Sequence, residues 1–351
     1  MLKSQTTLLI MIFILLGFSS CHKENSRIDI NLDEYSEKLT YSQISKKLDY
    51  IVLKAGNKCL LSDIEKIFFD KDTLIIQDTR HEGIFVFTTH GDFVKHINYI
   101  GQGPEEYRDD NSIAVDTILN QIYIYDMMNF KINKYSYNGA FISSDKMDSF
   151  IRDFAITKSR KFLMIQPCIN KRYGKNGLWL YHPEKKTIHP LLEDSGEDQE
   201  FEFMSTYITQ TENSIYYYDR NDDNIYLIEN DSLHKLYGIN LKQYLSNEVR
   251  KKDVLSENDL NQKAMMSDFC VSNRYIIINY FIFGKEESPF KWVMIDRENN
   301  NVSVFKHFTN DIDDSNSSNN KIFYLNDSTW CRLVDQKEND DNIVLQLIHL
   351  K

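Results

Sequence analysis

Hydrophobic and polar residues alternate along most of this chain in short runs, the pattern typical of half-buried β-strands. Residues 63–98 contain four such runs, and residues 112–144 contain four more in the same order. In both segments the first two runs end in Asp (IFFD and TLIIQD; IAVD and QIYIYD), and a turn containing Gly91 or Gly139 joins the last two. Glycine tolerates the positive φ that tight hairpins need. The pattern therefore predicts two successive four-stranded antiparallel units.

Four weaker units follow these two. They cover residues 150–192, 203–239, 266–308 and 320–350. Repeats of about 40 to 60 residues with four strands each are typical of propeller blades. The last unit supplies only three strands, whereas residues 45–54 (SKKLDYIVLK) form an unassigned strand before the first unit. We predict that this strand completes the sixth blade, because a ring left open would expose unpaired strand edges.

The predicted fold class is therefore all-β: a six-bladed β-propeller of four-stranded antiparallel blades over residues 45–351. One stretch departs from the pattern. Residues 240–266 lack alternation and carry Leu241, Tyr244, Leu245 and Val249 at near-helical spacing. We expect a short helical insertion there, between the fourth and fifth blades.

The N-terminus predicts export. A basic start at Lys3, an apolar run from Leu8 to Leu16 and small residues before Cys21 are typical of a secretory signal, and the apolar run is too short for a membrane span. The sequence FSSC ending at Cys21 matches a bacterial lipobox, with Phe18 where Leu is usual. We predict a lipoprotein signal peptide over residues 1–20, lipidation of Cys21 and a polar tether over residues 21–44. These features predict an outer-membrane lipoprotein, located on the periplasmic or the cell-surface side.

Composition limits the classes of binding partner that we expect. The formal net charge of −11 argues against nucleic acid, whose binding needs Lys and Arg to neutralise phosphates. Four cysteines besides Cys21 lie far apart without metal-ligand spacing: Cys59, Cys168, Cys270 and Cys331. We interpret them as buried thiols, with one disulfide as the alternative. We expect neither a metal site nor a cofactor.

Several segments resemble a known family. The FSSC sequence, the strand LDYIVLK, the block CLLSDIEKIFFDKDTLIIQD and the stretch IGQGPEEY are together similar to the six-bladed β-propeller lipoproteins of Bacteroidetes, which are related to NHL-repeat propellers. The resemblance implies the propeller fold and the envelope address, and it supplies no catalytic residues. Members usually show G-x-G-P-G-E-Y where this chain has GQGPEEY, so Glu105 replaces a third glycine. Residue 105 should then not need a positive φ.

The loop GQGPEEY (101–107) is open to two interpretations. As a structural corner, Gly would allow the turn, Pro104 would fix it and Tyr107 would pack under the next blade. As part of a ligand surface, Gln102, Glu106 and Tyr107 would meet Arg80 and Arg152. A phosphate cradle is excluded, because Pro104 removes an amide donor and two acids follow.

Propeller geometry predicts which loops share a face with 101–107. These are the loops that join the second and third strands of a blade, including 78–82, 126–129 and 219–223. Because function usually sits on the loops of a rigid scaffold, we predict a ligand site on this face, near the central channel. The candidate ligand-binding residues are Arg80, His81, Gln102, Glu106, Tyr107, Arg152 and Arg220.

The sequence favours a binding or scaffolding module for a glycan, a peptide or a protein partner, held at the membrane by its lipid. The alternative is a propeller lyase or hydrolase with Arg80, His81 and Tyr107 at the central channel. No G-x-S-x-G or H-E-x-x-H motif is present. Clustering of those residues about a deep pocket would favour the enzyme.

Overall fold

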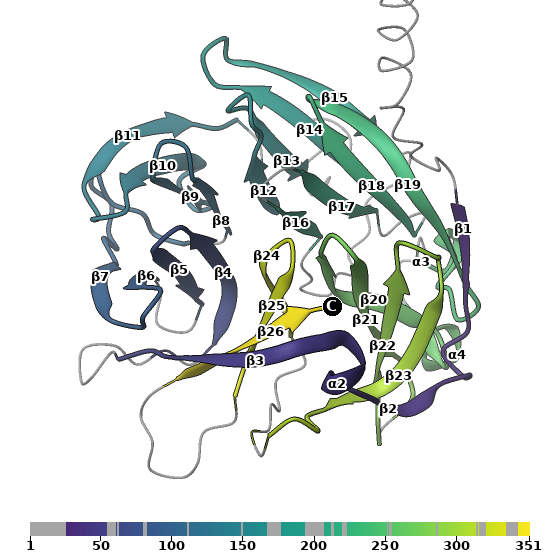
Figure 1. The fold of residues 1–351 in the computed structure, drawn as a ribbon. Helices are drawn as coiled ribbons and strands as arrows, with labels where there is room; N and C mark the ends of the chain where they lie inside the picture. Colours follow the sequence, from purple (N-terminus) through teal and green to yellow (C-terminus); the bar gives the residue numbers. More distant parts are fainter. Residues whose placement is uncertain are drawn as a thin grey trace, which may run out of the picture.

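Six sheets, each built on a four-stranded antiparallel blade, are arranged around a common axis and form the body of this computed structural model (Figure 1). The structure describes residues 26–351 except for the following segments: 55–60, 62, 80–82, 111, 149, 167–176, 194–206, 212–213, 220–222, 251, 253–254, 286, 314, 316–320 and 335–342. The signal peptide expected over residues 1–20 and the lipidation site Cys21 lie outside the described residues.

Each of the first three blades takes its four strands consecutively from the chain. Blade 1 contains β4 (Ile64–Asp70), β5 (Thr73–Asp78), β6 (Gly83–Thr88) and β7 (Phe93–Ile97). Blade 2 contains β8 (Ser112–Asp116), β9 (Gln121–Asp126), β10 (Lys131–Ser136) and β11 (Phe141–Lys146). Blade 3 contains β12 (Asp153–Ile156), β13 (Phe162–Gln166), β14 (Gly177–His182) and β15 (Thr187–Glu193).

The other three blades each recruit one strand from the N-terminal part of the chain. Blade 4 contains β16 (Ile208–Gln210), β17 (Ile215–Asp219), β18 (Asn224–Glu229), β19 (Ser232–Leu241) and, outside them, β1 (Ser26–Ile30). Blade 5 contains β20 (Ala264–Val271), β21 (Tyr275–Ile282), β22 (Phe290–Asp296), β23 (Val302–Thr309) and β2 (Ser36–Thr40). Blade 6 contains β24 (Phe323–Asn326), β25 (Thr329–Leu333), β26 (Val344–Leu350) and β3 (Ser45–Val52).

The Asp residues that end strands in the repeat hold the turns that follow them. Asp116 Oδ1 accepts hydrogen bonds from the backbone N–H groups of Ile118 (2.9 Å) and Leu119 (3.0 Å). Asp126 Oδ2 accepts one from Arg108 N (3.0 Å), which ties the loop entering blade 2 to the end of β9. Short Asp side chains satisfy turn amides in this way, because they reach backbone two or three residues on. Gly91 and Gly139 both have φ +83°, as their hairpins require.

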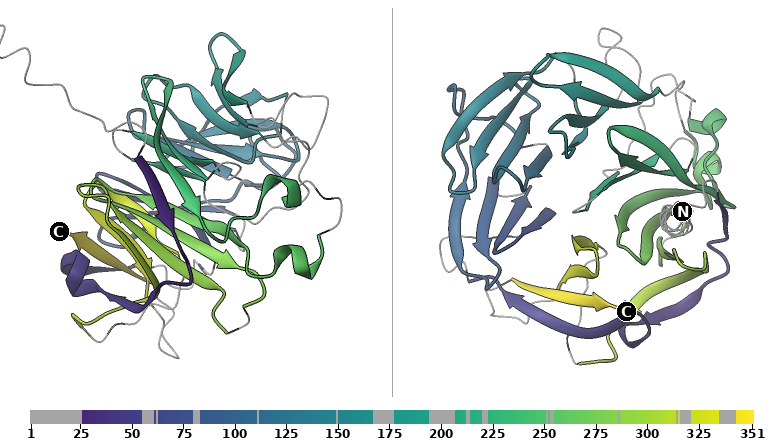
Figure 2. Two further views of the ribbon diagram at one scale, coloured as in Figure 1. Left: turned by 90° about the vertical axis from the view of Figure 1, so that its right-hand side faces the viewer. Right: turned by 45° about the horizontal axis from the view of Figure 1, so that its top comes forward.

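The predicted ring closure is confirmed. β3 pairs antiparallel with β26, so that Tyr50 lies opposite Gln346 and Ser45 opposite Leu350. The chain that begins the ring therefore also ends it, and blade 6 has its fourth strand. The outermost strand of every blade lies at the rim, and the innermost strands β4, β8, β12, β16, β20 and β24 surround the axis (Figure 2).

The N-terminal segment corrects one expectation. From Ser26 onward, residues assigned to a polar tether over 21–44 belong to the propeller, which thus begins at 26 rather than at 45. β1 pairs parallel with β19 and β2 pairs parallel with β23. The physical reason is the alternation in the sequence RIDINL, which buries Ile28 and Ile30 while Arg27 and Asp29 stay exposed. Residues 26–52 thus form a belt around the rim of blades 4, 5 and 6 (Figure 2).

Among the described residues, three four-residue helices interrupt the strands. α2 (Tyr41–Ile44) joins two strands of the belt, and the predicted insertion contains α3 (Asn247–Arg250) and α4 (Glu257–Leu260). The insertion is shorter than predicted, because β19 continues to Leu241 and β20 begins at Ala264. Among the described residues, no helix has both the length and the apolar character needed to cross a membrane.

Candidate functional site

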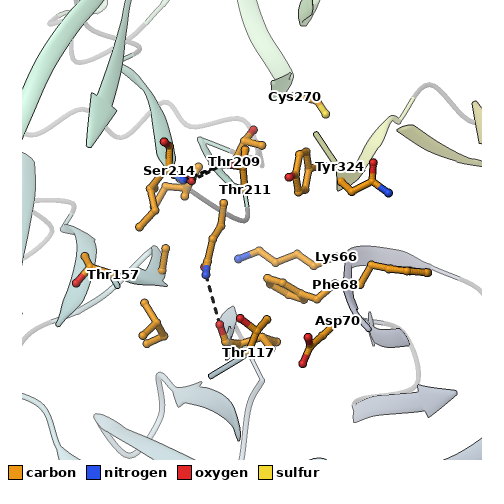
Figure 3. Close-up of a pocket in the computed structure, with 18 of the residues that line it drawn as sticks. Lys66, Phe68, Asp70, Thr117, Thr157, Thr209, Thr211, Ser214, Cys270 and Tyr324 are labelled. Carbon is orange, nitrogen blue, oxygen red and sulfur yellow. Dashed lines mark hydrogen bonds between the residues drawn. The ribbon is translucent and has the colours of Figure 1, made fainter. Parts of the chain in front are cut away.

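A cavity of about 1220 Å³ occupies the axis of the propeller. All six innermost strands or the turns that follow them contribute to its lining, from Glu65 in blade 1 round to Asn326 in blade 6. Figure 3 shows side chains from these strands converging on one space, with Lys66, Phe68 and Tyr324 on the right of the view, Thr157 on the left and Thr209 above.

The propeller has two faces, which we name from their connections. The loop face carries the connections between blades, such as 98–111, and the connections from second to third strands. The hairpin face carries the turns from first to second and from third to fourth strands. The cavity lining extends along β4 to Asp70 and Lys71, and it includes Thr117, Ser159 and Asn230. Asp70 ends β4 and the other four residues belong to turns of the hairpin face, so the cavity reaches that face.

The two sides of the cavity differ in chemistry. Phe68 of β4 and Tyr324 of β24 are half-buried aromatic side chains from neighbouring blades. Opposite them, blades 3 and 4 contribute hydroxyl groups: Thr157, Ser159, Thr209, Thr211 and Ser214. Gln210 Nε2 reaches from blade 4 to donate to Val115 O in blade 2 (3.4 Å). The cavity thus combines an aromatic wall with a hydroxyl wall.

Charged side chains gather where the cavity approaches the loop face. Lys66 in blade 1 forms an ion pair with Asp153 in blade 3, and its Nζ also donates to Ser112 Oγ in blade 2 (3.2 Å). The Ser112 hydroxyl in turn donates to Asp153 Oδ1 (2.7 Å). Glu65 pairs with Lys321 of blade 6 (2.8 Å). These pairs neutralise each other, which keeps the cost of their burial low.

Asp268 of β20 differs from the other acids at this end. Its side chain is buried, and its Oδ2 accepts from Ile322 N at 3.4 Å. Burial raises the pKa of Asp268 to about 6; Lys321 opposes this effect, whereas Glu65 adds to it. A buried carboxyl with a pKa near the operating pH can hold or release a proton in a way that an exposed carboxylate cannot.

The loop 101–107 has the contacts of a structural corner. Glu106 Oε2 accepts from Gly103 N (2.8 Å), and a Cβ at Gly101 would lie 1.9 Å from this oxygen. The fully buried Tyr107 donates its hydroxyl to Ile97 O (2.7 Å) and packs edge-on against Tyr135 of blade 2. Glu105 is not among the described residues with positive φ, as the substitution of the third glycine suggested.

The structure places the other nominated residues on the loop face or outside the described residues. Gln102 is exposed beside this corner, and Arg152 is half-buried, its backbone N–H donating to Ile165 O (2.9 Å). Arg80, His81 and Arg220 lie outside the described residues. Of the described nominees, none lines the cavity. Ligand binding at the loop face therefore stays a prediction. Tyr107 does not suit the alternative enzyme site, because its hydroxyl donates to a backbone carbonyl.

Two of the four cysteines can be placed. Cys270 and Cys331 are buried free thiols, and burial raises the pKa of both. Cys59 and Cys168 lie outside the described residues, so a disulfide between those two stays open. The described residues contain no group of three or more His, Cys, Asp or Glu side chains able to hold a metal ion.

Sequence reasoning missed the cavity residues Lys66, Phe68, Asp268 and Tyr324. A signal was present: in each repeat the innermost strand ends at a recognisable turn, and alternate residues before that turn face the axis. Counting back two and four residues from Asp70 gives Phe68 and Lys66. The sequence does not show, however, at which face the axial space opens.

Comparisons with known proteins agree with this architecture. A family model described as "Domain of unknown function (DUF4934)" matches residues 25–345. A predicted exported protein of Bacteroides fragilis has a similar crystal structure, with a TM-score of 0.73 at 15% identity over 93% of this chain and 100% of that one. A member of the DUF4221 family from Bacteroides vulgatus gives a TM-score of 0.55 at 10% identity over 88% and 97%. These likenesses show the fold alone.

No curated protein matches the sequence. The family model covers nearly all of the described chain, from the first belt strand to the start of β26, the last strand in the sequence. This six-bladed β-propeller therefore belongs to the DUF4934 family.

Proposed function

We propose that this protein is a lipid-anchored binding module of the cell envelope, which holds a sugar unit of a glycan in its central cavity. The observation that carries the proposal is the pairing of an aromatic wall, Phe68 and Tyr324, with a hydroxyl wall on blades 3 and 4. A sugar ring presents an apolar C–H face and a rim of hydroxyl groups, so it matches both walls. Pockets of 300–1,000 Å³ hold small ligands, and a cavity of about 1220 Å³ also admits a short oligosaccharide.

The address rests on the sequence. Lys3, the apolar run that follows and the FSSC sequence at Cys21 support export and lipidation. The structural neighbour from Bacteroides fragilis is itself a predicted exported protein. Replacing Cys21 by Ala should move the protein from the membrane fraction to the soluble fraction. Unchanged fractionation would contradict the anchor.

A thermal-shift screen of the purified protein against saccharides and short peptides tests the ligand. A saccharide should raise the melting temperature, and Phe68→Ala should weaken its binding about tenfold or more, because the stacking surface is lost. Met128→Ala is the control, since this exposed side chain lies on the loop face away from the cavity. If binding is lost in Gln102→Ala but kept in Phe68→Ala, the ligand is on the loop face. A shift with peptides only would exclude the sugar.

One observation favours a second candidate, a hydrolase or lyase. Asp268 borders the cavity, and its pKa of about 6 suits proton transfer near neutral pH. If the screened saccharide is consumed by the wild type but only bound by Asp268→Asn, the protein is an enzyme. Binding without turnover in both proteins leaves the binding module as the function.

A further inference from the structure

The belt begins at a fixed place on the rim of blade 4. Ser26 pairs with Tyr237, and the pairing ends with Ile30 opposite Leu241. Because β19 starts at Ser232, its first five residues have no belt strand outside them. The point where the chain joins the propeller is therefore on the outermost strand of blade 4, far from the axis (Figure 1).

The distance from this point to the proposed lipid anchor is short. Five residue steps separate Cys21 from Ser26. A fully extended chain covers at most about 3.6 Å per residue, so the connection spans no more than about 18 Å. A lipid on Cys21 therefore keeps the rim of blade 4 close to the bilayer surface. A tether reaching to residue 44 would have left the propeller free to tumble.

Two basic residues lie beside this attachment point. Arg27 lies opposite Gly238 in the β1–β19 pairing. A Cβ at Gly238 would meet Cε and Nζ of Lys235 at 3.4 Å and Asn224 Oδ1 at 3.5 Å, so the Lys235 ammonium group lies beside Gly238, the residue opposite Arg27. Both side chains are exposed. The nearest acid on the belt, Asp29, accepts a hydrogen bond from Asn240 (2.6 Å).

The basic residues and the short connection to Cys21 therefore favour the same surface, the rim of blade 4. In a chain of net charge −11, Arg27 and Lys235 present positive charge at the place that the anchor holds nearest the lipid. Within the part of the chain that the structure describes, Arg27 and Lys235 take part in no ion pair. Basic residues next to a lipid anchor are attracted to anionic headgroups, and the second signal converts loose tethering into stable docking.

We propose that the rim of blade 4 around Arg27 and Lys235 docks on the anionic surface of the membrane in which the lipid of Cys21 is embedded. The propeller then stands on its edge, with its axis along the membrane plane. Both the hairpin face, where the cavity opens, and the loop face stay open to the sides. The inference rests on the proposed lipid anchor and is independent of the ligand.

Photocrosslinking of the full-length lipidated protein tests this orientation. The protein is reconstituted into vesicles of phosphatidylethanolamine and phosphatidylglycerol at a ratio of 3:1. A photoreactive amino acid replaces His234, exposed on β19, or Val94, exposed on β7 of the opposite blade 1. Lipid adducts should form at position 234 with about tenfold higher yield than at position 94. Equal yields would overturn the proposal.

Charge reversal tests the role of the two cations. Arg27→Glu/Lys235→Glu should lower the adduct yield at position 234 by about fivefold or more, the effect that about one basic residue has at an anionic surface. In vesicles of phosphatidylcholine alone the same variant should match the parent protein. The control Lys46→Glu/Lys146→Glu changes the net charge equally on blades 6 and 2 and should keep the yield. A loss as large in the control would contradict specific docking.

Failure of the anchor and failure of the orientation give different results. If Cys21→Ala stays in the membrane fraction, the lipid anchor is wrong. If the wild type floats with the vesicles while positions 234 and 94 crosslink equally, the anchor stands and the orientation is wrong.

Discussion

Lys66 on blade 1 reaches across the end of the central cavity to form an ion pair with Asp153 on blade 3. The Ser112 hydroxyl of the intervening blade hydrogen-bonds to both partners. Three consecutive blades are thus joined at the axis, at the end of the cavity nearest the loop face. This link resists any widening of the ring there.

Removal of one partner of this pair should be costly. We expect Lys66→Met to lower the free energy of unfolding by about 3 kcal/mol, because Asp153 would remain charged and buried without its cation. Urea denaturation at pH 7 measures the change. In the control Lys54→Met, the lost pair with Asp92 (2.9 Å) is exposed and should change stability by less than about 1 kcal/mol. Similar losses in both variants would contradict a structural role for the axial pair.

Asp268 should make stability fall as pH rises. Its pKa of about 6 in the folded protein exceeds the ordinary value of 3.8, so the native state binds its proton more tightly than the unfolded state does. Its contribution is therefore favourable below about pH 4 and is lost as pH rises to about 6. Relative to Asp268→Asn, the wild type should lose about 3 kcal/mol over this window. Denaturation curves for both proteins at pH 4, 5, 6 and 7 measure the difference. Parallel pH profiles would show that Asp268 does not titrate in this window.

In the corner at residues 101–107, we expect substitutions of Gly101 and Glu106 to have non-additive effects on stability. Gly101→Ala should destabilise the protein by about 1 kcal/mol, because the new Cβ would lie 1.9 Å from Glu106 Oε2 and would force this carboxylate out of its hydrogen bond with Gly103 N. In the Glu106→Ala background the same change should cost much less, since the clashing carboxylate is gone. Melting temperatures of the two single variants and the double variant form the cycle. Additive effects would mean that the Glu106 side chain does not occupy this space.

Gln243 should stabilise the belt locally without affecting the strand pairing that closes the ring. This buried side chain accepts a hydrogen bond from Leu32 N (3.0 Å) and donates to Asn31 Oδ1 (3.0 Å) and Asp33 Oδ2 (2.8 Å), where the belt crosses from blade 4 to blade 5. We expect Gln243→Ala to speed amide exchange over residues 28–33 by about tenfold, while β3 stays protected by its pairing with β26. Asn240→Ala, which removes only the exposed bond to Asp29, is the control. Faster exchange in β3 would show that the belt and the closure unfold together.

The repeat, the number of blades and the closure of the ring by residues 45–54 were determined by the sequence itself. These features depend on the local alternation of hydrophobic and polar residues. They also depend on turn residues such as Gly91 and Gly139, whose positive φ is needed by the hairpin immediately around them. The structural role of Gly101 and Tyr107 was predictable as well, because their contacts lie within residues 97–107. The alternation of Ile28 and Ile30 also indicates a strand at the start of the belt, but its parallel partner lies 211 positions away and leaves no signal in the local sequence.

Only the tertiary structure decided where the cavity lies and which side chains face it. Lys66, Asp153 and Asp268 come from three different blades, and each is an ordinary charged residue in its own repeat. Their burial, their pairing and the raised pKa of Asp268 arise when six innermost strands close around one axis and remove these side chains from bulk solvent. Alternation tells which residues of a strand share a side, whereas the identity of the groups across the axis depends on how the ring closes.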